Sequence, residues 1–137
     1  MLEKALASTD RKLRVYLQLN TSHEESKAGL NSVSDLAALA KHIRSSCPHL
    51  EVVGLMTIGS YEASHDNDTS NPDFEALSKA REELGEPDLE LSMGMSADFA
   101  KAITMGSDNV RVGSRAFGSR PSKEEARVLR ETEKQAH

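Results

Sequence analysis

The 137-residue sequence has no tryptophan, only three phenylalanines and two tyrosines, and a single cysteine. A hydrophobic core must therefore be aliphatic, and one cysteine cannot build a disulfide framework, which fits a reducing compartment. No apolar run approaches the roughly 18 residues that span a bilayer, and the N-terminal segment lacks the apolar stretch of a signal peptide. The net charge of −5 comes from acids and bases mixed along the chain, without the basic stripe of nucleic-acid binders. We expect a cytoplasmic protein that binds neither membranes nor nucleic acid, with the mitochondrion as the alternative location.

Common functional motifs are missing as well. The segment 65–70, HDNDTS, faintly resembles a calcium loop but lacks the turn glycine and the final glutamate of such a loop. The five histidines show no metal-ligand spacing. The sequence contains no Walker loop, no G-x-G-x-x-G fingerprint and no G-x-S-x-G motif. The sequence therefore predicts no metal site, and nothing in it marks nucleotide binding or serine hydrolysis.

Strand-like and helix-like segments alternate along the chain. Apolar and β-branched runs predict strands over 13–19, 50–59, 88–93 and 109–112. Helical spacing predicts helices from an N-cap at Ser34 to Cys47, over 73–84, from Ser96 to Gly106 and over the tail 122–136, with a loop over 60–72.

This alternation predicts an α/β fold with a parallel sheet and crossover helices. We expect residues 1–137 to form a single partial domain. Its favoured architecture is four βα units of a parallel (β/α)8 TIM-type barrel, in other words a C-terminal half-barrel, and the alternative is a compact open parallel sheet.

Small residues follow the third and fourth predicted strands. Ser96 comes after the first of these strands, and Gly113 and Ser114 come after the second. Because the carboxyl ends of neighbouring parallel strands lie together, these hydroxyls and backbone amides could hold one anion such as a phosphate. The alternative, in which Ser96 is only a helix N-cap and Gly113 only a turn residue, has equal support from the residues alone.

Arg111 lies inside the fourth predicted strand, between Val110 and Val112. If the two valines pack against helices, the arginine points to the other face of the sheet, where its charge needs a partner. That partner is either a ligand nitrogen or carboxylate, or a structural Asp or Glu. The residue pattern alone favours the structural salt bridge.

Four blocks carry a family resemblance. In order, LQLNTSHEESKAGL, LEVVGLMTIGS, LSMGMSADFAKAI and NVRVGSRAFGSRP resemble the pyridoxal-phosphate homeostasis proteins, which are single-domain relatives of the alanine racemase N-terminal barrel. The likeness covers residues from about 13 to 128, and SHEESK and SRPSKEEAR look most like fungal members. It implies a fold type III pyridoxal 5'-phosphate (PLP) barrel. It further implies that the phosphate lies at Ser96, Gly113 and Ser114, that Arg111 faces the pyridine nitrogen, that Met56 lies near the ring, and more loosely that Lys27 lies near the ring hydroxyl.

The likeness begins at the family's fifth strand. The family's Schiff-base lysine belongs to the first strand, and none of the eight lysines here matches it. The resemblance thus implies a truncated, non-enzymatic PLP-binding protein of intracellular PLP homeostasis, without covalent attachment of the cofactor. The alternatives are a fragment of an amino-acid racemase and a phosphate-binding or structural βα fragment that holds no PLP.

Open edges are a further expectation of the half-barrel. A half-barrel has two unpaired strand edges and an uncovered inner face, expected here to be apolar near Met56 and Met95. We therefore expect self-association through these edges. The competing arrangement is a sheet whose exposed side is covered by the tail helix over 123–136.

Overall fold

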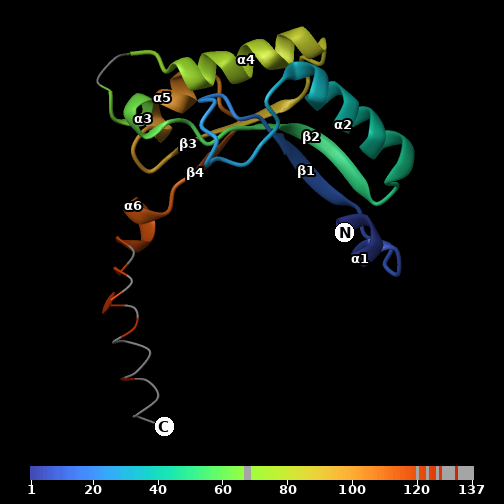
Figure 1. Cartoon of the computed structure of the whole chain (residues 1–137), viewed down its shortest axis with the longest axis horizontal. Helices are drawn as coiled ribbons and strands as arrows, with labels where there is room; N and C mark the ends of the chain where they lie inside the picture. The colour runs from blue at the N-terminus through green and yellow to red at the C-terminus, as the bar shows by residue number, and fades with distance from the viewer. Residues whose placement is uncertain (67–68, 120, 123, 126, 128–131, 133–137) are drawn as a thin grey trace.

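A computed structural model of the protein describes residues 1–66, 69–119, 121–122, 124–125, 127 and 132 (Figure 1). Four parallel strands form one open sheet in the order β1-β2-β3-β4. The strands are β1 (Leu13–Gln18), β2 (Leu50–Met56), β3 (Glu90–Met95) and β4 (Asn109–Arg111). The helices are α1 (Leu2–Leu6), α2 (Val33–Ser46), α3 (Tyr61–His65), α4 (Pro72–Leu84), α5 (Phe99–Thr104) and α6 (Ser114–Phe117). The predicted parallel α/β sheet is confirmed.

The three helices α2, α4 and α5 cover one face of the sheet (Figure 1). Alternate strand residues point to that face, because side chains on a strand alternate between its two sides. The core is aliphatic except for one phenylalanine, as the composition requires, and its buried members are Leu17, Leu19, Leu36, Ala40, Ile43, Leu55, Phe74, Leu77, Ala80, Leu89, Leu91, Met93 and Ala102. The opposite face of the sheet carries no helix layer among the described residues.

The predicted helix boundaries need two corrections. The N-cap of α2 is Ser32, whose hydroxyl accepts the backbone N–H of Asp35 at 3.1 Å, so the prediction of Ser34 was wrong. Helix α5 begins at Phe99, not directly after Ser96, because residues 96–98 form a turn first.

Three short helices were not predicted from the sequence. They are α1, α3 and α6, and α3 lies inside the stretch 60–72 that was expected to be a loop. By contrast, α4 matches its prediction within one residue, since Asn71 caps its start, Pro72 follows, and left-handed Gly85 ends it. Most of the helix predicted over 122–136 lies outside the described residues.

The face opposite the helices is polar at its amino end, away from Met56 and Met95, where an apolar face was expected. Arg14 Nη2 lies 2.7 Å from Glu90 Oε1, and the Tyr16 hydroxyl donates to the other oxygen of the same carboxylate. Further along, the Ser92 hydroxyl donates to Asn109 at 3.2 Å. The expectation did not cover this end of the sheet, where the alternate residues of β1 and β3 on this side are polar, whereas Met95 at the other end is exposed.

Two glycines allow close approaches that shape the sheet. A Cβ on Gly54 would lie 2.3 Å from the Glu90 carbonyl oxygen and 2.6 Å from Cε1 of Tyr16, so the missing side chain lets the Tyr16 ring cross β2. Gly94 has a φ of +95°, and a Cβ there would lie 2.4 Å from the Cβ of Ala102. Helix α5 therefore packs directly on β3, and the turn between them is tight.

The chain itself covers part of one sheet edge. After β1 the loop 19–31 folds back, so that the Leu30 N–H donates to the Gln18 carbonyl and the Leu30 carbonyl accepts the Asn20 N–H, both at 2.8 Å. The carboxyl end of β1 is thereby paired on both sides, since Leu19 donates to Met56 on the β2 side. The edge that the half-barrel prediction left open is closed at this end.

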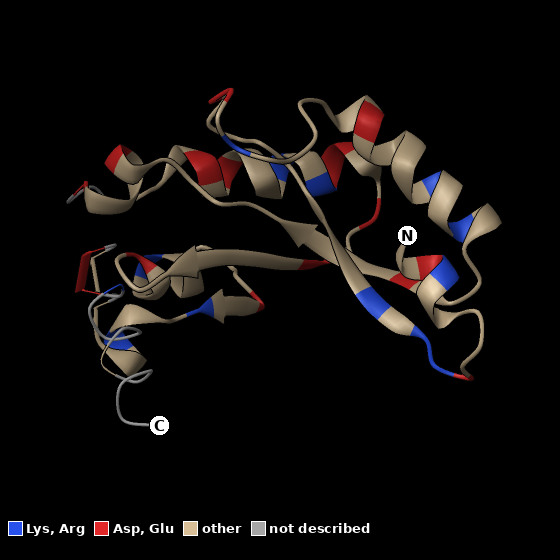
Figure 2. Cartoon of the chain, turned by 60° about the horizontal axis from the view of Figure 1, so that its bottom comes forward, with Lys and Arg blue, Asp and Glu red and all other residues tan. Residues whose placement is uncertain are grey.

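Charges of both signs lie side by side along the helices (Figure 2). Several are paired, including Arg44 with Glu86 and Lys79 with Glu83. Within the residues that the structure describes, no helix combines the length and apolarity needed to cross a membrane.

Candidate functional site

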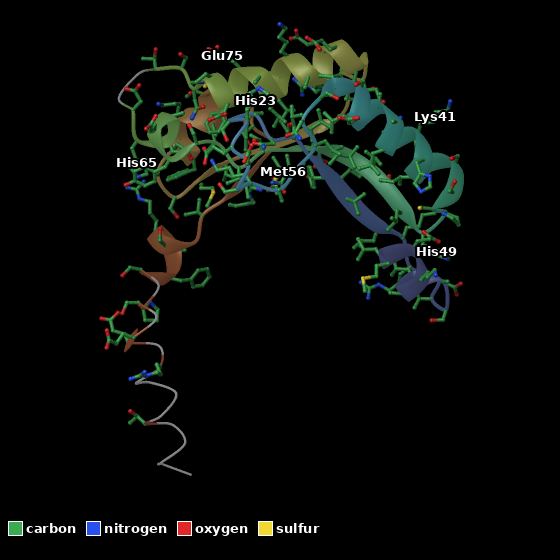
Figure 3. The ribbon with its side chains drawn as sticks, viewed as in Figure 1. His23, Lys41, His49, Met56, His65 and Glu75 are labelled. Atoms are coloured by element: carbon green, nitrogen blue, oxygen red, sulfur yellow. The ribbon has the colours of Figure 1, made fainter. Side chains whose placement is uncertain are left out.

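A pocket lies at the carboxyl ends of the strands, where the loops after all four strands converge. Four of the five predicted ligand residues line it, namely Ser96, Arg111, Gly113 and Ser114, and so does Lys27. Met56, the fifth, is not among the lining residues. It is half-buried and belongs to β2, next to core residue Leu55, and Figure 3 places it near the middle of the sheet, on the side away from α4.

The hydroxyl of Ser96 joins the ends of β3 and β4. Its oxygen accepts the backbone N–H of Gly113 at 3.1 Å and that of Arg115 at 3.4 Å. The N-cap of α5 is Asp98, so the simpler interpretation of Ser96 as a helix N-cap is wrong. The juxtaposition of the two small-residue turns, inferred from the parallel sheet, is confirmed.

Gly113 leaves open space beside these amides. A Cβ built at this glycine would meet no other atom within 4 Å. Ser114 begins α6 directly after it. Ser96, Gly113 and Ser114 therefore share one wall of the pocket, and their hydroxyl and backbone N–H groups are donors that suit an anion with several oxygens.

Arg111 supplies a cation at the same wall. Its Nη2 donates to the carbonyl oxygen of Thr57 at 2.7 Å, and the described part of the chain places no carboxylate within 4.0 Å of the guanidinium nitrogens. The structural salt bridge that the sequence favoured is therefore not formed. Burial lowers the pKa of Arg111, while the negative charge of Asp98 acts in the opposite direction, and the guanidinium stays protonated.

Lys27 closes the other side of the pocket. Its Nζ donates to Glu24 Oε1 at 2.7 Å, to the Gly59 carbonyl at 2.9 Å and to the Ser22 hydroxyl at 3.3 Å. The hydrogen bond from Lys27 lowers the pKa of Glu24. With all three donors engaged, this ammonium group fastens the loop after β1 to the loop after β2.

Three buried polar residues around the pocket were not predicted. Thr57 shares a hydrogen bond with the Thr21 hydroxyl at 2.8 Å, and Asp73 accepts the N–H and hydroxyl of Ser60 at 2.8 and 3.1 Å. Asp98 accepts the Met95 N–H at 2.7 Å. The available signal was a polar residue within or next to an otherwise apolar run, which alone does not distinguish a buried residue from an exposed one. No group of His, Cys, Asp and Glu side chains in the described ranges could hold a metal ion.

The fold and the site define a class of protein: an open half of a parallel βα barrel with hydrogen-bond donors at the carboxyl ends of its strands. The family described as "Alanine racemase, N-terminal domain" matches residues 1–121, and the chain belongs to it.

Several relatives are named pyridoxal phosphate homeostasis protein. The human one is 48% identical over 132 residues, which cover 88% of this chain and 47% of that protein. The fission yeast one is 50% identical over 120 residues, which cover 85% of this chain and 49% of that protein. The bovine one is 53% identical over 116 residues, which cover 80% of this chain and 41% of that protein. Because an animal relative is as similar as the yeast one, the special likeness of two segments to fungal members stays a prediction. The chain spans about half the length of the curated relatives it matches.

Solved structures agree with the fold. PipY of Synechococcus elongatus, solved with PLP bound, has a TM-score of 0.62 and 25% identity, over 85% of this chain and 54% of that one. The same protein solved without PLP has a TM-score of 0.69 and 29% identity, over 85% of this chain and 55% of that one. Alanine racemase from Corynebacterium glutamicum, with a TM-score of 0.55 and 22% identity over 81% and 31%, shares the fold.

Proposed function

We propose that this chain binds PLP through its phosphate and serves intracellular PLP homeostasis. The observation that carries the proposal is the Ser96 hydroxyl, which gathers the amides of Gly113 and Arg115 at the meeting point of two strand ends. A phosphate oxygen can accept from the same donors. PipY, a relative in structure, was solved with PLP bound, and the human relative is named for PLP homeostasis.

Each predicted residue has a role in this proposal. Ser96, Gly113 and Ser114 hold the phosphate with hydroxyl and amide groups, and Arg111 donates to the pyridine nitrogen. A cation at that nitrogen keeps it unprotonated, because a second positive charge beside the first is disfavoured. Met56 does not line the pocket and has the least support of the five.

PLP supplies an electron sink when it is bound, and an unprotonated ring is the weaker form of that sink. The residues of this chain bind and orient, and no lysine matches the one that holds the cofactor covalently in the family. The matching relatives are called homeostasis proteins. We therefore propose a non-enzymatic role in the cytoplasm, with the mitochondrion as the alternative, supported by the single cysteine.

Substitution of Gly113 by valine tests the site. A Cβ at this position meets no other atom within 4 Å, so we expect the fold to persist while the γ-methyl groups fill the place of the phosphate. We expect the Kd for inorganic phosphate and for PLP, measured by calorimetry, to rise at least about tenfold. Gly113→Ala is the graded control and should lie between the parent and Gly113→Val. Equal binding by Gly113→Val and the parent would place the site elsewhere, and phosphate binding without PLP binding would favour the phosphate-only alternative.

We also propose that the isolated chain self-associates through the edge of β4. Strand β4 pairs with β3 alone among the described strands, whereas Leu30 closes the carboxyl end of the β1 edge. An unpaired strand edge is a template for another strand. Sedimentation velocity over a concentration series should show reversible association. A stable monomer at high concentration would contradict this proposal.

A further inference from the structure

Asp98 stands behind the wall of the pocket. The residue is only 5% exposed and does not line the pocket. It occupies the N-cap position of α5, but its side chain makes no capping bond to that helix. The carboxylate turns back instead and accepts the Met95 N–H at 2.7 Å.

This hydrogen bond closes the turn that presents Ser96. The Asp98 N–H also donates to the Met95 carbonyl at 3.1 Å, so Met95 and Asp98 are bonded in both directions. Ser96 and Ala97 lie between these two residues. The closed turn thus carries the Ser96 hydroxyl that accepts the Gly113 N–H.

We infer that Asp98 is a positioning residue for the anion end of the ligand. Its hydrogen bond to the Met95 N–H holds the turn that presents Ser96 to the anion. The ligand in this inference rests on the proposed function, whereas the positioning itself can be tested without a ligand.

Two substitutions test the hydrogen bond of Asp98. Asp98→Asn keeps a carbonyl oxygen that can accept the Met95 N–H but removes the charge, and Asp98→Ala removes both. Asp108 gives a matched control, because its carboxylate accepts the Leu91 N–H at 2.8 Å near the other end of the same strand.

The first experiment measures amide hydrogen exchange by NMR in the ligand-free chain. We expect Asp98→Ala to speed exchange at Met95 and also at Gly113, 15 residues further on, each at least about tenfold. Asp98→Asn should stay within about threefold of the parent at both amides, and Asp108→Ala should affect Leu91 and spare Gly113. Unchanged exchange at Gly113 in Asp98→Ala would overturn the positioning of Ser96.

The second experiment measures the Kd for inorganic phosphate and for PLP. Asp98→Ala should weaken the binding of both ligands at least about threefold, whereas Asp98→Asn and Asp108→Ala should bind both as the parent does. Unchanged phosphate and PLP binding by Asp98→Ala would overturn the role of Asp98 at the anion.

The two proposals can fail separately. If the parent binds neither phosphate nor PLP while exchange at Met95 and Gly113 changes as expected, the proposed function fails and the positioning of Ser96 stands. If the parent binds PLP and all Asp98 variants match it, the inference fails alone. Should Asp98→Ala not fold, Asp98→Glu, whose longer side chain displaces the carboxylate, replaces the alanine variant in both experiments.

Discussion

The two ends of β3 use the same kind of residue in different surroundings. Near each end an aspartate accepts a backbone N–H of the strand, Asp108 from Leu91 and Asp98 from Met95. At the amino end the other charges neutralise one another, since Glu90 bonds to both Arg14 and Tyr16. At the carboxyl end the Arg111 guanidinium donates to the carbonyl of Thr57 and has no carboxylate within 4.0 Å among the described residues. The amino end is an internally satisfied network, whereas the carboxyl end keeps a cation and several donors at a pocket.

This difference follows the division of work in parallel βα folds, in which the amino ends of the strands serve stability and the carboxyl ends carry ligands. The polar inner face is therefore no sign of a second binding site. Changes at the amino end should alter stability and leave ligand binding intact, and changes at the carboxyl end should do the reverse.

The largest effect is expected for Gly54→Ala, at the amino end. The new methyl group would collide with the Glu90 carbonyl at 2.3 Å and with the Tyr16 ring at 2.6 Å. We expect a loss of about 3 kcal/mol of folding free energy, measured by urea denaturation. Gly113→Ala is the control and should stay within about 0.5 kcal/mol of the parent. A tolerated Gly54→Ala would mean that the amino-end network contributes little to stability.

A smaller effect is expected for Glu90→Gln, which removes the charge at the centre of the amino-end network. The hydrogen bond to Glu90 raises the pKa of Tyr16, and the bonds from Tyr16 and Arg14 lower the pKa of Glu90. In Glu90→Gln the tyrosinate absorbance should therefore appear at lower pH than in the parent.

The linkage of these shifts to stability has a definite sign. Because the carboxyl pKa is lower in the folded state, its contribution is present above the unfolded value of about 4.3 and is lost as the pH falls through the folded value. The parent should thus lose stability on acidification more steeply than Glu90→Gln, in denaturation midpoints taken at successive pH values. Identical pH profiles would show that Glu90 is unlinked to folding.

The smallest effect is expected when PLP is trapped covalently on the lysine side chains of the chain. After treatment with PLP and borohydride, no single lysine should carry a full equivalent of label, because none matches the family's position and Lys27 is engaged by three acceptors. Peptide mapping by mass spectrometry checks this. One stoichiometrically labelled peptide, with Lys27 as the first suspect, would contradict it.

The sequence sufficed for the parts of the fold that depend on local pattern. Alternating apolar runs located the four strands, and the Asn71-Pro72 start and Gly85 end of α4 are local signals. The convergence of Ser96 and Gly113 followed from strand parallelism together with two small-residue turns.

Other features depend on contacts that no local pattern encodes. The start of α5 at Phe99 depends on the turn that Asp98 closes, and the polar inner face depends on Tyr16 crossing Gly54 to reach a third strand. The partner of Arg111 was a backbone carbonyl, which carries no signature in the sequence. These features are determined by tertiary packing.

The closed end of the β1 edge also restricts how another strand can be added. Leu30 already pairs at Gln18 and Asn20, so an added strand must align with the earlier part of β1, displaced toward its amino end. Tilted strands in a closed barrel require such a stagger between neighbours. The loop after β1 thus fixes the register of any added strand: a strand displaced toward the amino end of β1 can pair, and one aligned with the whole of β1 cannot.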